Sequence, residues 1–141
     1  MEIGYTTAEI RLHRGLTNDQ MNIFQKVLNQ FHKHFFEGKS NVGFEVEGMF
    51  FPGDRPKTVC RWEMESDFRL IYNDVFYCNN LEDHYQMVDW LQYLVDNFFN
   101  PLDVLVSGHL NFFSVDESLY GEVGISRSKI KVVVYKKKEN N

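Results

Sequence analysis

Two apolar stripes with a helical period constrain the fold of this chain more than any other feature of its sequence. In each stripe, large apolar residues recur at steps of three and four, as in a helix that buries one face. The first stripe predicts a helix that ends near Gly38 and has Thr17 or Asn18 as its N-cap; Thr17 and Gln20 have capping-box spacing. The second predicts a helix over 81–99, which Asn100-Pro101 terminates.

Segments with alternating apolar and polar residues surround both helices and predict strands. They lie near 5–12, 43–51, 57–65, 68–78, 103–113, 119–126 and 129–137. The expected order is therefore β-α-βββ-α-βββ. This order predicts a two-layer α+β fold, in which a largely meandering antiparallel sheet of about six to eight strands carries two helices on one face.

The two halves of the chain align with each other, which indicates an internal duplication of an αβββ unit. Leu28 and Phe35 match Leu91 and Phe98 at an offset of 63, and segment 46–50 matches 106–110 at an offset of 60. Two such units that share one sheet would bury the faces that a single unit leaves open. The alternative is chance agreement between apolar stripes in a chain that contains 13 Phe.

Length and composition are typical of one folded domain in a reducing compartment. The 141 residues suffice for a core, and 43% hydrophobic residues argue against disorder. Cys60 and Cys78 lack CxxC spacing and are expected to be buried thiols. With no signal-peptide pattern and no long apolar run, we expect a cytoplasmic protein. The expected divisions are a single domain over 1–135, repeat units 17–78 and 80–135, and a flexible tail over 136–141.

The C-terminal part of the chain contains a series of short motifs, namely segment 90–101, Gly108, Gly121-Glu122-Val123-Gly124-Ile125 and Lys129-Ile130-Lys131-Val132. The stretch from Glu47-Gly48 to Trp62 contains a looser match to a motif of the same kind. These motifs resemble those of a group of uncharacterised small proteins common in phage and mobile-element genomes, to which no activity is assigned. The chain departs from that group at Ser126-Arg127-Ser128-Lys129, where the group tends to have an acidic-Asn turn. Apolar and turn residues carry the likeness, so it speaks for fold more than chemistry.

Charge is distributed unevenly along the chain. No Lys or Arg lies between Arg69 and Arg127, whereas basic residues crowd the last fifteen positions. Glu82, Asp89 and Asp96 are spaced by seven and therefore share one face of the predicted second helix. Three readings of this pattern are open. It is a solvated helix face with a solubilising tail, an acidic surface that docks on a basic partner or imitates nucleic-acid phosphates, or a site where subunits pair acidic helix with basic strand.

The predicted function is that of a non-catalytic binding protein, which the resemblance implies to be a viral or mobile-element factor acting on a host protein in the host cytoplasm. The chain lacks GxGxxG, GxxxxGK[ST], GxSxG and HExxH motifs and has no His pair with metal-ligand spacing. We therefore expect no catalytic residue, metal or cofactor. The candidate partner-binding residues are Glu82, Tyr85, Asp89, Tyr93 and Asp96.

The alternative function is binding of a nucleotide-like small molecule in a pocket between the repeat units or at a dimer interface. Its anion-contacting candidates are Arg55, Lys57, Arg61 and Arg69, because guanidinium groups suit phosphate. A net charge of −5 argues against nucleic acid as a partner of the whole surface, although the basic C-terminal strand could contact phosphates. Trp62 alternates with Cys60 and Met64, which favours a packing anchor over a base-stacking platform.

Overall fold

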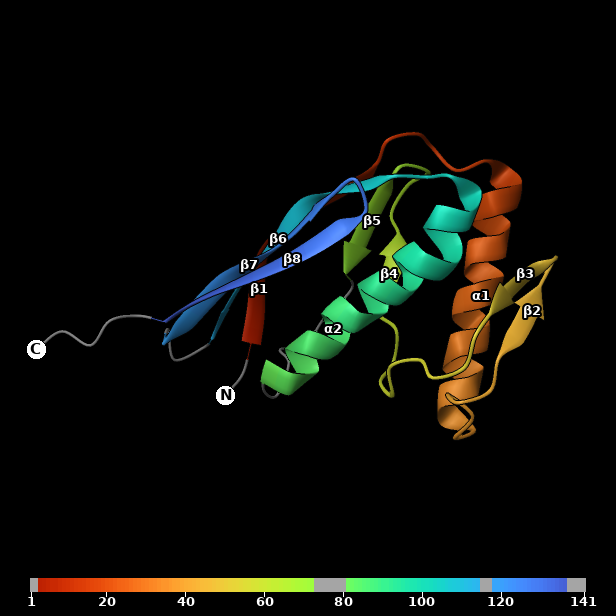
Figure 1. Ribbon diagram of the computed structural model, residues 1–141, viewed down its shortest axis with the longest axis horizontal. Helices are drawn as coiled ribbons and strands as arrows, with labels where there is room; N and C mark the ends of the chain where they lie inside the picture. Colours follow the sequence, from red (N-terminus) through yellow and green to blue (C-terminus); the bar gives the residue numbers. More distant parts are fainter. Residues whose placement is uncertain (1–2, 73–80, 115–117, 137–141) are drawn as a thin grey trace, which may run out of the picture.

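The computed structural model describes residues 3–72, 81–114 and 118–136 and shows an α+β fold (Figure 1). Its largest layer is a six-stranded antiparallel sheet with the strand order β4-β5-β1-β6-β7-β8. The predicted fold class is thereby confirmed. The strands of this sheet are β1 Ile3–Leu12, β4 Trp62–Met64, β5 Arg69–Tyr72, β6 Val106–Ser114, β7 Leu119–Ser126 and β8 Lys129–Lys136.

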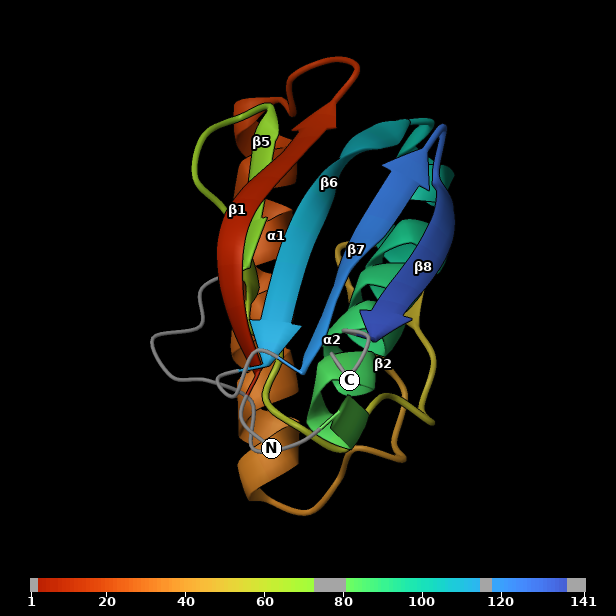
Figure 2. The ribbon, with the colours of Figure 1, turned by 90° about the vertical axis from the view of Figure 1, so that its left-hand side faces the viewer.

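Both helices lie on the same face of this sheet, as Figure 2 shows with the strands in front and the helices behind. Helix α1 spans Asn18–Phe36 and begins with the predicted capping box, in which Thr17 accepts from the Gln20 backbone N–H. Helix α2 spans Leu81–Leu94. It continues as a π-helical turn over Val95–Phe99 and a 3-10 turn over Asn100–Leu102.

The stretch between the helices differs from the prediction, because it contains four described strands where three were expected. Residues 43–51 do not form one strand but a hairpin of β2, Phe44–Val46, and β3, Met49–Phe51. The chain reverses at Glu47 and Gly48, which have φ angles of 47° and 84°, and two positive φ angles are the signature of a tight hairpin turn. The observed order is β-α-ββββ-α-βββ. The hairpin packs on α1, where Phe31 contacts Phe44 and Phe51.

One cluster of buried side chains joins the sheet, both helices and the hairpin. Phe24 of α1 lies 5.0 Å from Phe98 and 6.2 Å from Phe99 between ring centroids. The π-helical turn, which takes more residues per turn than an α-helix, places the consecutive Phe98 and Phe99 both in the core. Trp62 is buried as predicted, and its Nε1–H donates to the Met87 carbonyl at 3.0 Å.

The segments that suggested an internal duplication lie in different contexts. The helical stripes belong to α1 and α2, which cover the same face of the sheet. Segment 46–50, however, forms the turn of the separate β2–β3 hairpin, whereas segment 106–110 lies within the central strand β6. The fold therefore does not place the two segments matched at offset 60 in equivalent positions, and the duplication stays a prediction.

Candidate functional site

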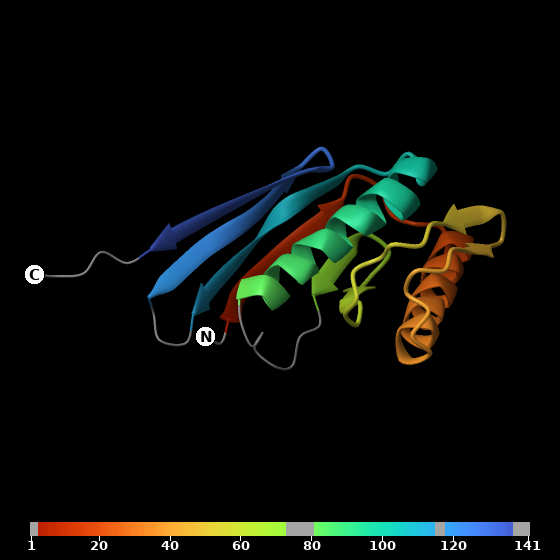
Figure 3. The same cartoon turned by 60° about the horizontal axis from the view of Figure 1, so that its bottom comes forward.

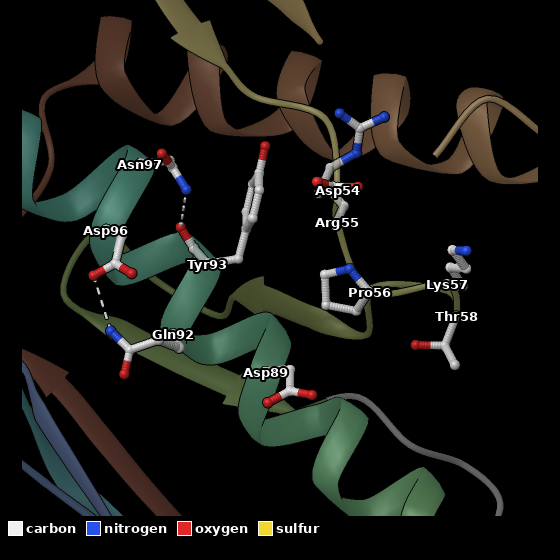
Figure 4. A pocket seen from close by; sticks show the side chains of 10 residues that line it. All are labelled: Asp54, Arg55, Pro56, Lys57, Thr58, Asp89, Gln92, Tyr93, Asp96 and Asn97. Carbon is white, nitrogen blue, oxygen red and sulfur yellow. Dashed lines mark hydrogen bonds between the residues drawn. The ribbon is translucent and has the colours of Figure 1, made fainter. Parts of the chain in front are cut away.

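A surface groove of about 740 Å³ runs between helix α2 with its π-helical turn and the loop that follows β3. One wall is the exposed face of α2 and its π-helical turn: α2 contributes Asp89 and Gln92, and the turn contributes Asp96. The opposite wall is the loop 54–58 (Figure 4). Figure 3 shows α2 and the loop after β3 on the helical side of the sheet. The groove that they line therefore lies away from the outer face of the sheet.

The loop wall is held in place by the buried side chain of Arg55, whose exposed fraction is 3%. Its guanidinium donates to the carbonyls of Val42 at 2.9 Å, Pro52 at 3.1 Å and Lys39 at 3.3 Å. It also lies over the rings of Phe31 and Phe44, at 5.6 and 5.0 Å from their centroids. In Figure 4 the guanidinium therefore points toward α1 and away from the groove.

Arg55 also fixes the protonation state of the buried His34. The Arg55 Nη2 lies 3.0 Å from His34 Nδ1. Because a guanidinium can only donate, His34 Nδ1 must be an unprotonated acceptor. Burial and the neighbouring Arg55 charge both lower the pKa of His34. The proton of the neutral ring is then on Nε2.

Two side chains of α2 connect the helix wall of the groove to the loop wall. The Tyr93 hydroxyl donates to the Pro52 carbonyl at 2.6 Å, and burial raises the pKa of Tyr93. The Trp90 Nε1–H lies 3.1 Å from Thr58 Oγ1 and 3.3 Å from the Thr58 carbonyl. The groove therefore has a fixed shape, because hydrogen bonds connect its two walls at both ends of the loop, at Pro52 and at Thr58.

The groove is predominantly acidic. Asp54, Asp89 and Asp96 are exposed around it, and among the described residues none of the three takes part in an ion pair. Gln92 Nε2 donates to Asp96 at 2.9 Å, which orients this carboxylate (Figure 4). Among the described lining residues, Lys57 provides the only cation directed at the groove, because the Arg55 guanidinium points toward α1.

The structure brings together some of the predicted partner-binding residues. Asp89 and Asp96 are exposed on one face of the α2 region, at the groove. Tyr93 lines the groove but is only 9% exposed and serves as a structural tie to Pro52. The side chains of Glu82 and Tyr85 lie outside the described residues, as does Cys78.

The four anion-binding candidates are not gathered into one pocket. Arg55 is buried in its carbonyl cage, and Lys57 stands alone at the groove. Arg61 lines a separate depression beside α1 and β4, and Arg69 Nε lies 3.4 Å from Glu65 Oε2. This arrangement gives the nucleotide-binding alternative little support.

Asp54 and Asn97 also line the groove, and neither was singled out from the sequence. The turn chemistry of Pro52-Gly53-Asp54-Arg55-Pro56 predicts a loop there, and Asp54 indeed has a φ of 58°. The position of that loop opposite α2 depends on the contacts of Arg55, Trp90 and Tyr93. No sequence signal reveals these contacts.

Two further kinds of candidate reactive group are possible metal ligands and the Cys60 thiol. No group of three or more His, Cys, Asp or Glu side chains in those residues could hold a metal ion. Cys60 is buried as predicted, and burial raises its pKa to about 12, so its thiol is unreactive at neutral pH.

Comparisons with family models, curated proteins and solved structures found no match to this chain. None of the described helices has the length and apolar character that crossing a membrane requires.

Proposed function

We propose that the protein is a non-catalytic binding protein that holds a basic segment of a partner protein in the groove beside α2. The observation that carries this proposal is the set of three exposed carboxylates, Asp54, Asp89 and Asp96, around a groove with tied walls. A one-sign field of this kind favours oppositely charged partners and speeds their encounter. The resemblance to phage and mobile-element proteins makes a host protein the expected source of the partner.

The shape of the groove favours a protein segment over an enclosed small molecule. Its volume of about 740 Å³ is within the range of small-molecule sites, but it is open to solvent along its length. Lys or Arg side chains of an extended segment could reach Asp89 and Asp96 while their apolar stems rest on Pro56 and the accessible part of Tyr93.

Charge reversal on the helix wall tests this function. The variant Asp89→Lys/Asp96→Lys should lose at least about tenfold in affinity for a synthetic Arg- and Lys-rich peptide, measured by fluorescence anisotropy at low salt. The matched control Glu9→Lys/Glu45→Lys makes the same change in net charge at exposed positions on β1 and β2. It should bind the peptide like the wild type.

Pull-down from host lysate, followed by mass spectrometry, extends the test to natural partners. The wild type and the control should capture the same basic protein, and the groove variant should not. Equal peptide affinity in all three proteins would rule the proposal out. A melting temperature that rises with nucleotides, together with no peptide binding, would favour the small-molecule alternative.

A further inference from the structure

The outer face of the sheet, opposite the helices, is a second surface with a distinct chemistry. No described helix or hairpin covers it, and Figure 2 shows β1, β6, β7 and β8 toward the viewer with α1 and α2 behind them. Burial alternates along β7: Leu119, Val123 and Ile125 are buried on the helical side. Tyr120 and Glu122 are exposed on the outer side.

Three aromatic side chains form a row across this outer face. Phe113 on β6 is paired with Tyr120 on β7, which is paired with Tyr135 on β8. The rings of Tyr120 and Tyr135 are stacked, with centroids 5.2 Å apart and an interplanar angle of 22°. They remain 52% and 48% exposed, so much of each ring is open to a ligand.

Basic side chains lie along the β8 rim of the same face. Lys129 and Lys131 precede Tyr135 on β8 at even spacing, and both are exposed, so they point to the same side of the sheet as the Tyr135 ring. Arg127, in the turn between β7 and β8, is exposed as well. Of the acids on this face, Glu9 lies on β1, and Glu122 on β7 is paired with Val133, so it borders the rim beside Lys131. With three cations and one bordering carboxylate, the rim keeps a net positive charge.

We propose that this face, the aromatic row Phe113-Tyr120-Tyr135 with the basic rim Arg127-Lys129-Lys131, binds single-stranded nucleic acid. Rings that stack on bases beside cations that follow the phosphates are the two components of sequence-tolerant single-strand binding. A duplex hides the faces of its bases, so the rings select the single strand. The inference departs from the expectation drawn from net charge, because the fold gathers cations on one rim of an acidic protein.

The site is independent of the groove, which lies on the opposite side of the sheet. Asp89→Lys/Asp96→Lys should therefore leave single-strand binding at least undiminished. Peptide binding and single-strand binding, each measured on the wild type and on Asp89→Lys/Asp96→Lys, therefore show separately whether the groove proposal or this proposal fails.

Anisotropy of a fluorescently labelled oligothymidylate of about 20 nucleotides, with a duplex of the same length as comparison, tests the proposal. The wild type should prefer the single strand. Tyr120→Leu/Tyr135→Leu should weaken its binding about five- to a hundredfold, the range that loss of base stacking produces. The control Phe36→Leu/Phe50→Leu removes two rings that are 78% and 63% exposed elsewhere, and should bind normally.

The salt dependence tests the basic rim separately. Lys129→Glu/Lys131→Glu should reduce the slope of log affinity against log salt concentration by about 1.4, since each single-strand phosphate contact contributes about 0.7. Lys33→Glu/Lys39→Glu, at exposed positions near the end of α1, should leave the slope unchanged.

Three results would overturn the proposal. They are no measurable binding of the single strand at low salt, equal affinity for single strand and duplex, and unchanged affinity of the tyrosine variant. If nucleic acid does not bind, light scattering gives the alternative. A dimeric wild type together with a monomeric tyrosine variant would assign the face to a second copy of this chain.

Discussion

Arg55 is the residue on which the geometry of the groove depends most. It is 3% exposed, and no carboxylate pairs with it among the described residues. Three carbonyls, the His34 ring and two aromatic faces surround it instead. A buried charge persists only when it is satisfied in this way. From sequence Arg55 could be predicted as an anion ligand but not as a structural anchor, because its acceptors come from distant backbone positions.

The His34–Arg55 contact predicts a loss of stability in acid. Unfolded His34 has an ordinary pKa of about 6.5, and the folded value is lower, so between the two values only the unfolded state binds the proton. The stabilisation is complete above about pH 6.5 and is lost as the pH falls through the folded pKa, with a slope of at most about 1.4 kcal/mol per pH unit. Urea unfolding of the wild type across this range measures the slope.

The variant His34→Gln provides the control for this pH dependence. Its side-chain carbonyl can still accept from Arg55 but does not titrate, so its free energy of unfolding should depend less on pH than that of the wild type. Equal slopes in the two proteins would show that His34 is not the titrating group.

At the scale of elements, local signals account for α1 and the C-terminal strands. The capping box predicts the start of α1, and strict alternation predicts β7 and β8 with bounds close to those observed. The hairpin β2–β3 was wrongly predicted as one strand, because alternation continues through Glu47 and Gly48 and conceals the turn.

The pairing of β6 with β1 requires a glycine at position 108. Gly108 has a φ of 147°, and a Cβ added there would overlap the backbone of β1.

The capping box at the start of α1 should contribute measurably to the free energy of unfolding. Thr17→Ala removes the acceptor of the Gln20 N–H and should lower the free energy of unfolding by about 1 kcal/mol. Thr17→Ser keeps a hydroxyl and should recover most of the loss. Urea denaturation of the three proteins measures these differences, and an unchanged midpoint in Thr17→Ala would show that the cap is dispensable.

At the scale of the whole molecule, one core connects layers that are distant in sequence. Phe24, Phe98 and Phe99 join α1 to the end of α2, and Trp62 joins the sheet to α2 through the Met87 carbonyl. With this arrangement, the two faces that we assign to different ligands rest on the same buried side chains.

A core of this kind predicts cooperative unfolding. Phe98→Ala removes a fully buried ring and should lower the free energy of unfolding by about 3–5 kcal/mol. Far-UV circular dichroism and tryptophan fluorescence should still report one common transition in urea. Phe36→Ala, at a position that is 78% exposed, should change the stability by less than about 0.5 kcal/mol. Separate transitions for the two probes would contradict a single core.

The sequence by itself determined the elements of local origin: two amphipathic helices, the start of α1, the alternating strands and hence the α+β class. It also placed Asp89 and Asp96 on one exposed helix face. Only the tertiary structure decided which loop faces α2, that Arg55 turns inward, and that Phe113, Tyr120 and Tyr135 meet in a row. The physical reason is range: helical period, alternation and caps depend on neighbouring residues, whereas these contacts join segments that only the folded core brings together.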